Sequence, residues 1–222
     1  MSIIFTDNYT VGADANIDAY PSGDPDYAYN IGSGTNIIVS GANDRAEVAD
    51  TQADIIARIS DASMPTGDQE IIGNICRALA TSTGRIYLGV RWATSGTLTN
   101  GYRLLVDTNQ VNEVRLFRVD AGTSVSLAAT DQGFPNADQT VKMRLKATGA
   151  GATVTLTYQI DAATELTFND SNANRKTSGV PAVGGRRNSG VAAVFLDDVT
   201  VDDLVAAKAF VPQATMVPMM AM

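Results

Sequence analysis

The side chains that enzymes use for acid, base or nucleophilic chemistry are sparse and scattered in this chain. No histidine occurs among the 222 residues, which excludes His-based triads, Cys-His pairs and the commonest zinc ligand. A retaining glycosidase needs two carboxyl groups about 5 Å apart, whereas the glutamates are dispersed, at Glu47, Glu70, Glu113 and Glu165. Aspartates that converge in space remain the alternative source of such a pair. We therefore expect a non-enzymatic protein with no catalytic residues and no cofactor.

Two groups of aspartates have the chemistry of a calcium site, which takes carboxylate and backbone carbonyl oxygens. The denser group is Asp197, Asp198, Asp202 and Asp203, and the other is Asp14, Asp18, Asp24 and Asp26 in a Gly- and Pro-rich segment. Neighbours on a strand face opposite sides, so Asp197 and Asp198 cannot share an ion without a bulge. We favour solvated aspartates that bond turn amides over a metal site.

Few aromatic residues suit a sugar site, which generally combines an aromatic platform with polar hydrogen-bonding groups. Trp92 is the only tryptophan, at the end of GRIYLGVRW, and it is in phase with the apolar residues of that segment. This phase favours a core position for Trp92 over a platform. Tyr87 and Arg91 share the opposite face, where they could contact a sugar or a neighbouring protein.

A second polar spot is Gly184-Gly185-Arg186-Arg187. No strand-to-helix context follows it, which disfavours a phosphate-binding loop. We interpret it as a loop tip whose arginines, Arg186 and Arg187, pair with acidic groups of a partner or contact a glycan.

The elements that must position these side chains are β-strands. The arms TVKMRLKAT and ATVTLTYQI, within residues 139–160, flank a Gly-Ala-Gly turn and alternate apolar with polar residues. A period of two predicts a hairpin with one solvated face, and such a face is typical of an antiparallel sheet packed on a core from one side. We therefore expect an all-β fold, an antiparallel two-sheet sandwich.

Further strands are expected at nearly regular spacing, separated by turn signals. They are ADIIARIS, EIIGNICRAL, GRIYLGVRW, GYRLLVD, NEVRLFRVD and TSVSLAAT, with short strands at residues 2–5 and 36–40. The segment SGVAAVFLDDVTVDDL is expected to form two closing strands. The polar segment 169–189, rich in Asn, Gly and Arg, is expected to be a long loop.

Composition argues against several classes of partner. The net charge is −8, with basic residues scattered along the chain, so a nucleic-acid partner is not expected. No uncharged apolar stretch approaches the roughly 20 residues that span a bilayer, and MSIIFTDNYT lacks the pattern of a secretory signal, which predicts synthesis in a cytoplasm. Cys76, the only cysteine, is expected to be a buried small hydrophobe.

The end of the chain is an apolar arm. AFVPQATMVPMMAM carries no charged side chain, and its two prolines prevent a continuous helix. We expect a β-sandwich over residues 1–205 and an extended arm over 206–222 that packs on its own domain or on another chain. The residues expected to dock are Phe210, Val211, Pro212, Met216, Val217, Pro218, Met219 and Met220.

Three segments resemble the concanavalin A-like lectin and glucanase superfamily, in particular its laminin-G-like jelly rolls, which also occur in structural proteins of tailed bacteriophages. They are FTDNY (5–9), GYRLLVDTNQVNEVRLFRVDAGTSVSLAAT and SGVAAVFLDDVTVDDL. The resemblance implies a jelly-roll sandwich. The glucanases of this superfamily carry two glutamates that flank an aspartate on one strand, and no such cluster occurs here.

Taken together, these features predict a virion structural protein of a tailed bacteriophage, most simply one that decorates and stabilises a capsid or forms a head or tail appendage. Its partners would be the major capsid protein or another virion protein, and copies of itself in a homo-oligomer. The alternative is a carbohydrate-binding module that recognises cell-surface glycans. Neither hypothesis involves nucleic acid, a membrane or a metal.

Overall fold

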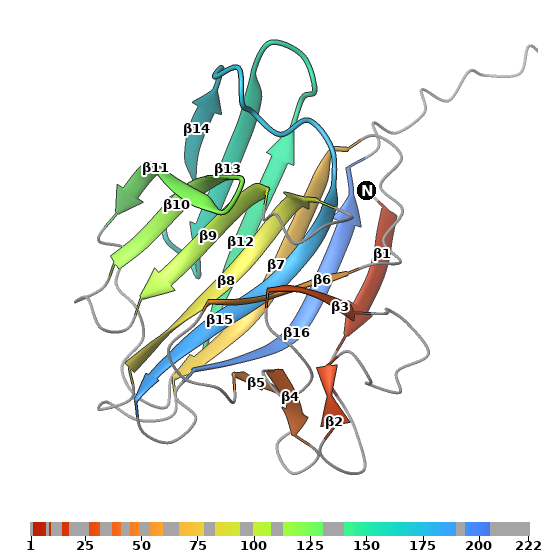
Figure 1. Ribbon diagram of the computed structural model, residues 1–222, viewed down its shortest axis with the longest axis vertical. Helices are drawn as coiled ribbons and strands as arrows, with labels where there is room; N and C mark the ends of the chain where they lie inside the picture. Colours follow the sequence, from red (N-terminus) through yellow and green to blue (C-terminus); the bar gives the residue numbers. More distant parts are fainter. Residues whose placement is uncertain are drawn as a thin grey trace, which may run out of the picture.

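The computed structural model is a sandwich of two antiparallel sheets (Figure 1). The structure describes residues 2–7, 9, 15–17, 27–31, 37–40, 45–48, 54–59, 67–77, 83–93, 100–107, 113–130, 140–189 and 194–204. This part of the chain contains no α-helix, and accordingly none of a length and apolarity that would cross a bilayer. The predicted all-β jelly-roll sandwich is confirmed.

Over the described residues, the first sheet has nine strands, and β7 and β16 pair near its centre. Its order is β14-β13-β12-β7-β16-β5-β4-β2, and β1 pairs with β16 beside this path. The strands are β14 (Leu166–Asp170), β13 (Val154–Ile160), β12 (Thr140–Thr148), β7 (Gln69–Arg77), β16 (Val194–Asp203), β5 (Arg45–Val48), β4 (Ile37–Ser40), β2 (Ala15–Asn16) and β1 (Ser2–Asp7).

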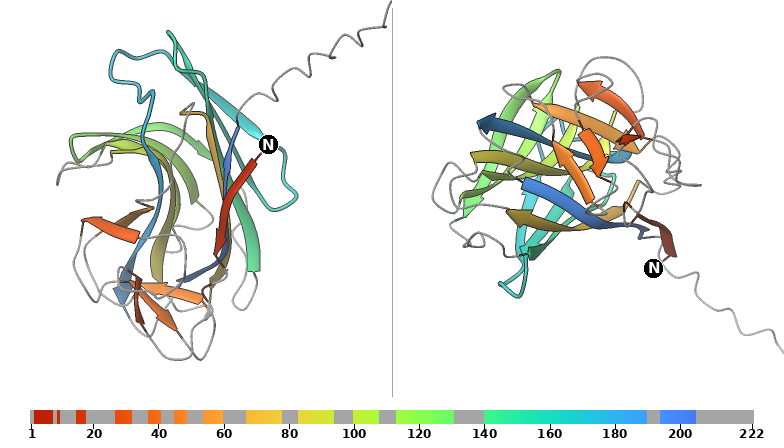
Figure 2. Two further views of the ribbon diagram at one scale, coloured as in Figure 1. Left: turned by 90° about the vertical axis from the view of Figure 1, so that its right-hand side faces the viewer. Right: turned by 90° about the horizontal axis from the view of Figure 1, so that it is seen from below.

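The second sheet, in the part of the chain that the structure describes, has seven strands in the order β11-β10-β9-β8-β15-β6-β3. They are β11 (Thr123–Thr130), β10 (Glu113–Asp120), β9 (Gly101–Asp107), β8 (Thr83–Trp92), β15 (Val180–Ser189), β6 (Ile55–Ile59) and β3 (Tyr27–Ile31). Figure 2 shows that this sheet bends away from the nine-stranded sheet at both ends, so that its backbone is concave on the outer side.

The predicted hairpin is confirmed as β12 and β13, which pair from Met143 opposite Ile160 to Thr148 opposite Thr155. The alternating apolar residues of both arms are buried between the sheets, while Lys142 is exposed. The buried set is Val141, Met143, Leu145, Ala147, Val154, Leu156, Tyr158 and Ile160. Alternation therefore assigned the faces of this hairpin correctly.

One continuous core fills the space between the sheets. Fully buried aliphatic side chains come from both layers, for example Leu88 and Leu104 from the seven-stranded sheet and Leu145 and Leu156 from the nine-stranded sheet. Each buried side chain of this size stabilises the fold by about 1.5–3 kcal/mol relative to exposure. Packing of this kind holds the sheets together, since the single cysteine, Cys76, is unpaired and only half-buried rather than buried.

The prediction of a loop over residues 169–189 is wrong for its second half. Strand β15 is an interior strand of the seven-stranded sheet, between β8 and β6, so Arg186 and Arg187 are strand residues and not a loop tip. The glycines serve close strand packing, because a Cβ on Gly184 would lie 2.2 Å from the carbonyl oxygen of Ile55. Glycine therefore marks a backbone contact here rather than a turn.

The closing segment forms one strand, β16, rather than two. It bends at a bulge between Asp197 and Thr200, where Asp198 adopts a positive φ of 48°. Asp198 accepts a hydrogen bond from the amide of Asn74 (Nδ2 to Oδ2, 2.8 Å). The bulge that Asp197 and Asp198 would need in order to share an ion is therefore present. However, the described residues contain no group of three acidic, His or Cys side chains that could hold a metal ion. The second aspartate group lies outside the described residues.

Candidate functional site

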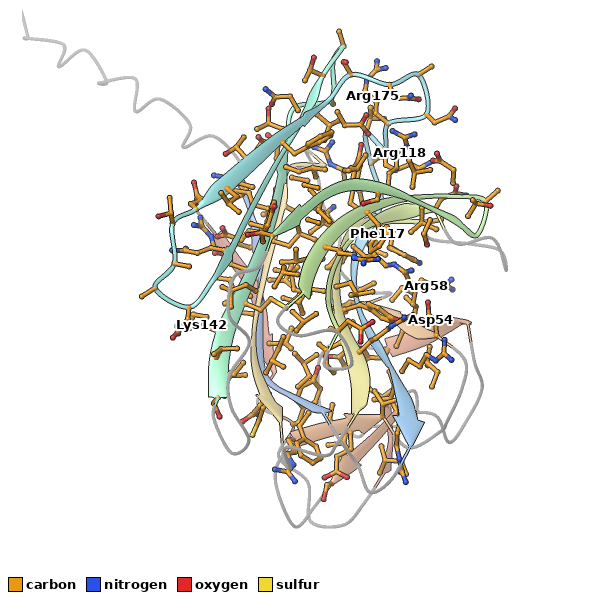
Figure 3. The ribbon with its side chains drawn as sticks, turned by 90° about the vertical axis from the view of Figure 1, so that its left-hand side faces the viewer. Asp54, Arg58, Phe117, Arg118, Lys142 and Arg175 are labelled. Atoms are coloured by element: carbon orange, nitrogen blue, oxygen red, sulfur yellow. The ribbon has the colours of Figure 1, made fainter. Side chains whose placement is uncertain are left out.

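The outer side of the seven-stranded sheet, toward which its strands curve, carries the candidate site and is called the concave face from here on. Side chains alternate across each strand, so the residues between core positions point to this face. Figure 3 shows three of them, Asp54, Arg58 and Phe117, on the side around which the strands bend. The described side chains of the face include Asp54, Ile56, Arg58, Arg85, Tyr87, Trp92, Arg103, Leu105, Asp107, Arg115, Phe117, Val119, Ser124, Ser126, Ala129, Ala182 and Arg186.

A small apolar cluster, separate from the main core, forms the floor of the concave face. Its buried members are Ile56, Tyr87, Trp92, Leu105, Val119 and Ala182. Phe117 packs against them but stays partly exposed. Among the described aromatic residues of this face, Phe117 is thus the one with a surface that a ligand can reach.

Trp92 is buried, as predicted, but on the opposite face from the one predicted. Val180 pairs with Trp92 whereas Ala182 pairs with Gly89, so β8 contains one extra residue, and Arg91 takes a positive φ of 54° there. This bulge moves Trp92 out of phase with the main core and into the floor of the concave face. Its indole ring lies over Gly101, where a Cβ would come within 2.4 Å of Cε3. At 0 % exposure it offers no platform to a sugar.

Arg91 is a structural residue and not a ligand contact, which corrects the prediction. Its side chain is fully buried and donates to the backbone oxygens of Gly67 (2.8 Å) and Lys176 (2.9 Å) and to the carboxylate of Asp68 (3.1 Å). Burial lowers the pKa of Arg91, and the charge of Asp68 opposes that effect. The arginine therefore joins three segments at the edge of the sandwich.

Tyr87 is also buried, so it positions other groups instead of stacking on a ligand. Its hydroxyl donates to Asp54 Oδ1 (2.5 Å), and Arg103 Nη1 donates to Asp54 Oδ2 (3.0 Å). The Arg103 guanidinium lies 4.6 Å from the Tyr87 ring centroid and 5.3 Å from that of Phe117. Burial, reinforced by Asp54, raises the pKa of Tyr87, so the phenol remains a neutral donor. This arrangement fixes Asp54 and Arg103 beside Phe117.

A second ion pair lies near one end of the face. Arg85 Nε donates to Asp107 Oδ2 at 2.8 Å; partial burial alone would lower the pKa of Arg85, but this bond holds it above the ordinary value. Arg186 sits directly opposite Arg85 in the ladder. Arg187, the next residue, points to the other face by alternation. Of the predicted contact residues, only Arg186 is therefore a partly exposed member of the site.

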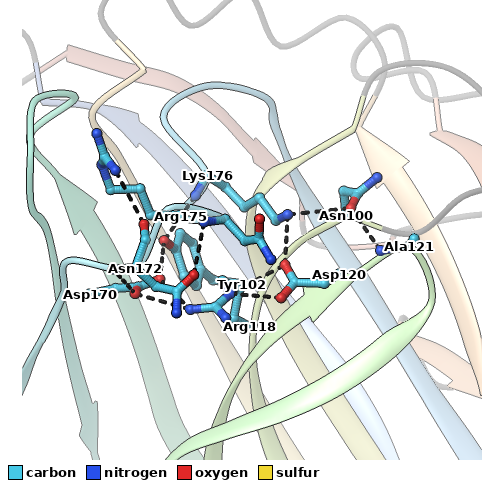
Figure 4. A network of polar contacts seen from close by, with 10 residues as sticks. Asn100, Tyr102, Arg118, Asp120, Ala121, Asp170, Asn172, Arg175 and Lys176 are labelled. Atoms are coloured by element: carbon cyan, nitrogen blue, oxygen red, sulfur yellow. Dashed lines mark hydrogen bonds and ion pairs between the residues drawn. The ribbon is translucent and has the colours of Figure 1, made fainter.

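A network of polar side chains at the end of the sandwich resembles a binding site, but its members form hydrogen bonds and ion pairs with one another (Figure 4). Asp170 accepts from Arg118 (3.0 Å) and from the hydroxyl of Tyr102 (2.8 Å), and Lys176 donates to Asp120 (2.8 Å). These bonds fasten the connection between β14 and β15 onto the seven-stranded sheet. We interpret the network as a clasp that stabilises the fold.

The predicted docking arm, residues 206–222, lies outside the described residues. Its role, the capsid or other virion partner, the homo-oligomer and a location in a virion therefore stay predictions.

No family model matches the chain, and no curated protein matches its sequence. Solved structures match it in fold. A Bacillus subtilis protein of unknown function with a galectin-like fold has a TM-score of 0.63 over 91 % of this chain and 96 % of that chain, at 11 % identity. The carbohydrate binding module CBM66 from Bacillus subtilis has a TM-score of 0.57 over 79 % and 94 %, at 15 % identity. A Bacillus licheniformis β-glucanase has a TM-score of 0.57 over 89 % and 96 %, at 12 % identity.

Identity this low shows a shared fold alone. The fold is the jelly roll common to these galectin-like, CBM66 and β-glucanase structures, in agreement with the concanavalin A-like resemblance of the sequence. The comparisons include both a carbohydrate-binding module and an enzyme, so function must be argued from the residues of this chain.

Sequence reasoning missed most of the partly exposed residues on the concave face, namely Asp54, Arg58, Arg85, Arg115 and Phe117. One signal for them was present. In NEVRLFRVD, Arg115 and Phe117 alternate with the apolar residues of the core face. That pattern distinguishes the two faces of the strand, but it does not show how the sheet curves.

Proposed function

We propose that this protein is a carbohydrate-binding module without catalytic activity, and that the concave face binds the sugar. The observation that carries the proposal is the partly exposed ring of Phe117 beside polar groups that the fold holds in place. An aromatic ring supplies an apolar surface for the C–H face of a sugar, and fixed donors and acceptors supply specificity. The fold shared with a carbohydrate binding module supports the proposal.

The polar groups beside the ring are preorganised. Asp54 is held by Tyr87 and Arg103, and Arg103 also donates to the hydroxyl of Ser124 (2.9 Å). Groups that are already ordered lose little conformational entropy when a ligand binds. Asp54 retains 26 % side-chain exposure, so it can accept hydrogen bonds from sugar hydroxyls.

The absence of catalysis is part of the proposal. A glycosidase needs one carboxylic acid that donates a proton and a second carboxylate close by. The described carboxylates of the concave face, Asp54 and Asp107, both accept from arginines, so neither is arranged as a proton donor. We expect no release of reducing sugar from a bound glycan, and turnover that disappears in Asp54→Asn would contradict this part.

Binding is tested by screening the full chain on an array of neutral and acidic glycans, followed by calorimetry with the best ligand. We expect Phe117→Ala to weaken binding at least fivefold, which corresponds to about 1 kcal/mol. Phe168→Ala is the matched control, because Phe168 is a partly buried phenylalanine of β14 in the other sheet.

Phe117→Leu distinguishes the contribution of the aromatic ring to binding from that of apolar packing, since it keeps an apolar side chain over the floor of the face. We expect it to fold as the unchanged chain does and still to bind more weakly. Unchanged affinity in both Phe117 variants would refute the concave face as the sugar site.

A further inference from the structure

We propose that two copies of this chain pair edge to edge through strand β11, with Val125 of one copy opposite Val125 of the other across a two-fold axis. The pairing goes beyond the proposed function and does not depend on it. Strand β11 lies at one edge of the seven-stranded sheet, and within the described part of the chain it pairs with β10 alone. An edge strand of this kind offers backbone N–H and C=O groups to a strand of another chain.

The first half of β11 is exposed on both of its faces. Residues 123–126 are all exposed. Ser126 lies opposite Phe117 and therefore on the concave face, whereas Val125 lies opposite Arg118 and points to the other side. Exposure on both faces shows that neither face of this half packs against another layer, so a partner strand meets no obstacle above or below the sheet.

Strand β11 also lacks the features by which edge strands usually avoid pairing, namely short length, charged side chains and proline. Its sequence TSVSLAAT has eight residues, with neither a charge nor a proline. The other edge strands of the described part are shorter: β1 has six residues, β3 and β14 have five each, and β2 has two. Strand β11 is therefore the described edge that is best suited to pairing.

A bulge limits the pairing to the first half of the strand. Ser126 pairs with Phe117 and Ala128 pairs with Leu116, so Leu127 is an extra residue in β11. A bulge bends a strand and disturbs its ladder, which is a further way to protect an edge. The register of residues 123–126 is regular, and the interface is therefore centred there.

A second copy of the chain is the partner that this edge fits. The net charge of the chain is −8, so most contacts between two copies would bring like charges together, whereas residues 123–126 carry no charge. Val125 is 36 % exposed and is the exposed large apolar side chain among the described residues. Antiparallel pairing about a two-fold axis at Val125 covers both valines at once, and it places Ser124 opposite the partner's Ser126.

The small size of the interface predicts a reversible dimer. A standard interface buries about 1,600 Å², and a few residues of one strand from each copy bury less. We expect monomers at about 1 μM and a substantial fraction of dimers at about 200 μM.

Pairing through β11 places the two concave faces on the same side of one continuous sheet, because the two-fold axis is perpendicular to the sheet. Phe117 lies on β10, directly beside β11. Three strand spacings and an offset of two residues separate the two Phe117 positions, which corresponds to about 15 Å. If the proposed function holds, one long glycan can contact both copies, and the dimer binds it more tightly than a monomer does.

The first test is sedimentation velocity between about 1 and 200 μM, over which the mass should rise from 23.3 kDa toward twice that value. Val125→Glu places two carboxylates opposite each other at the axis and should abolish the dimer. Its cross-strand neighbour within the chain is Arg118, so the monomer should still fold. Thr167→Glu is the control and should leave the dimer unchanged, because Thr167 has the shape of valine and is exposed on β14, an edge strand of the other sheet.

The second test is disulfide cross-linking, and it holds even where Val125→Glu fails to fold. Residues that oppose their own copy have Cα atoms about 4.5–5.5 Å apart, within the range of a disulfide. Val125→Cys should therefore form a linked dimer on oxidation at about 200 μM, the concentration at which the dimer is expected. Ser126→Cys is the matched variant that should not, since its own copy lies about 8 Å away in this register. The unchanged chain, in which Cys76 is the only cysteine, controls for links through Cys76.

Each outcome supports or overturns the pairing. Loss of the dimer in a folded Val125→Glu, together with a cross-link in Val125→Cys, would support it. An unchanged chain that stays monomeric at about 200 μM would overturn it, as would a dimer that persists in a folded Val125→Glu or a linked dimer that forms in Ser126→Cys and not in Val125→Cys. None of these results bears on sugar binding, which the glycan array and the Phe117 variants test separately.

Discussion

Truncating Asp170 to alanine tests the most buried ion pair of the clasp. Asp170 is 3 % exposed, and its carboxylate accepts from Arg118 Nη1 (3.0 and 3.1 Å), from the Tyr102 hydroxyl (2.8 Å) and from the backbone N–H of Asn172 (3.0 Å). The variant leaves these donors without that acceptor, in a region where water does not replace it.

Breaking a buried pair by removing one partner typically costs 3–5 kcal/mol. Here Arg118 keeps a second carboxylate, since its Nε still donates to Asp120 (3.0 Å). We therefore expect the lower end of that range, about 3 kcal/mol, for Asp170→Ala. Asp170→Asn keeps the shape of the side chain and one acceptor oxygen, so the free energy of unfolding should fall by less, about 1.5–2 kcal/mol.

The control is the same kind of truncation at an exposed pair. Glu165 pairs with Arg144 at 2.6 Å, but its side chain is 47 % exposed, and exposed pairs contribute about 0–1 kcal/mol. Urea unfolding followed by the fluorescence of the single tryptophan, Trp92, which is buried, measures all three variants in one assay.

The reasoning predicts a ranking as well as a magnitude. If Asp170→Ala loses no more stability than Glu165→Ala, burial does not determine how much free energy these ion pairs contribute, and the clasp does not stabilise the fold. A double-mutant cycle with Arg118→Met gives the coupling energy directly, and a coupling near zero would lead to the same conclusion.

Two further predictions concern stability. Gly101→Ala should cost about 1–3 kcal/mol, because its Cβ would lie 2.4 Å from Cε3 of the buried Trp92 ring; an unchanged urea midpoint and emission maximum would contradict the packing. The pKa of Asp120 is below its ordinary value of 3.8, because bonds from Lys176 and Arg118 outweigh partial burial, which alone would raise it. A depressed folded-state pKa adds stability that is complete well above pH 4 and is lost as pH falls through the folded value. Asp120→Asn should therefore reduce the fall in the free energy of unfolding below about pH 4. If that fall is unchanged in the variant, the bonds to Asp120 do not stabilise the fold.

Most of the strands could be predicted from the sequence. The segments NEVRLFRVD and TSVSLAAT correspond to β10 and β11 within one residue at each end. Alternation and turn residues are properties of consecutive amino acids, so they can be recognised without knowing what packs on the strand.

The errors arose where residues distant in the sequence meet. Strand β15 was predicted as a loop because VPAVGGRRNS contains two glycines and two arginines in place of a regular apolar pattern. In the sheet its glycines allow the backbone of β6 to approach, and Arg186 belongs to the solvated side of a central strand. The neighbours that make this composition suitable are supplied only by the fold.

The sequence by itself determined an all-β chain, the positions of most strands and the core face of the β12–β13 hairpin, because side-chain alternation is local. Only the tertiary structure decided which face holds Trp92. That choice depends on the bulge at Arg91, and the bonds that Arg91 makes to Gly67, Asp68 and Lys176 join segments up to 85 residues apart. The curvature of the face that carries Phe117 and the arginines likewise belongs to the whole sheet, because twist and bending accumulate over paired strands rather than within one.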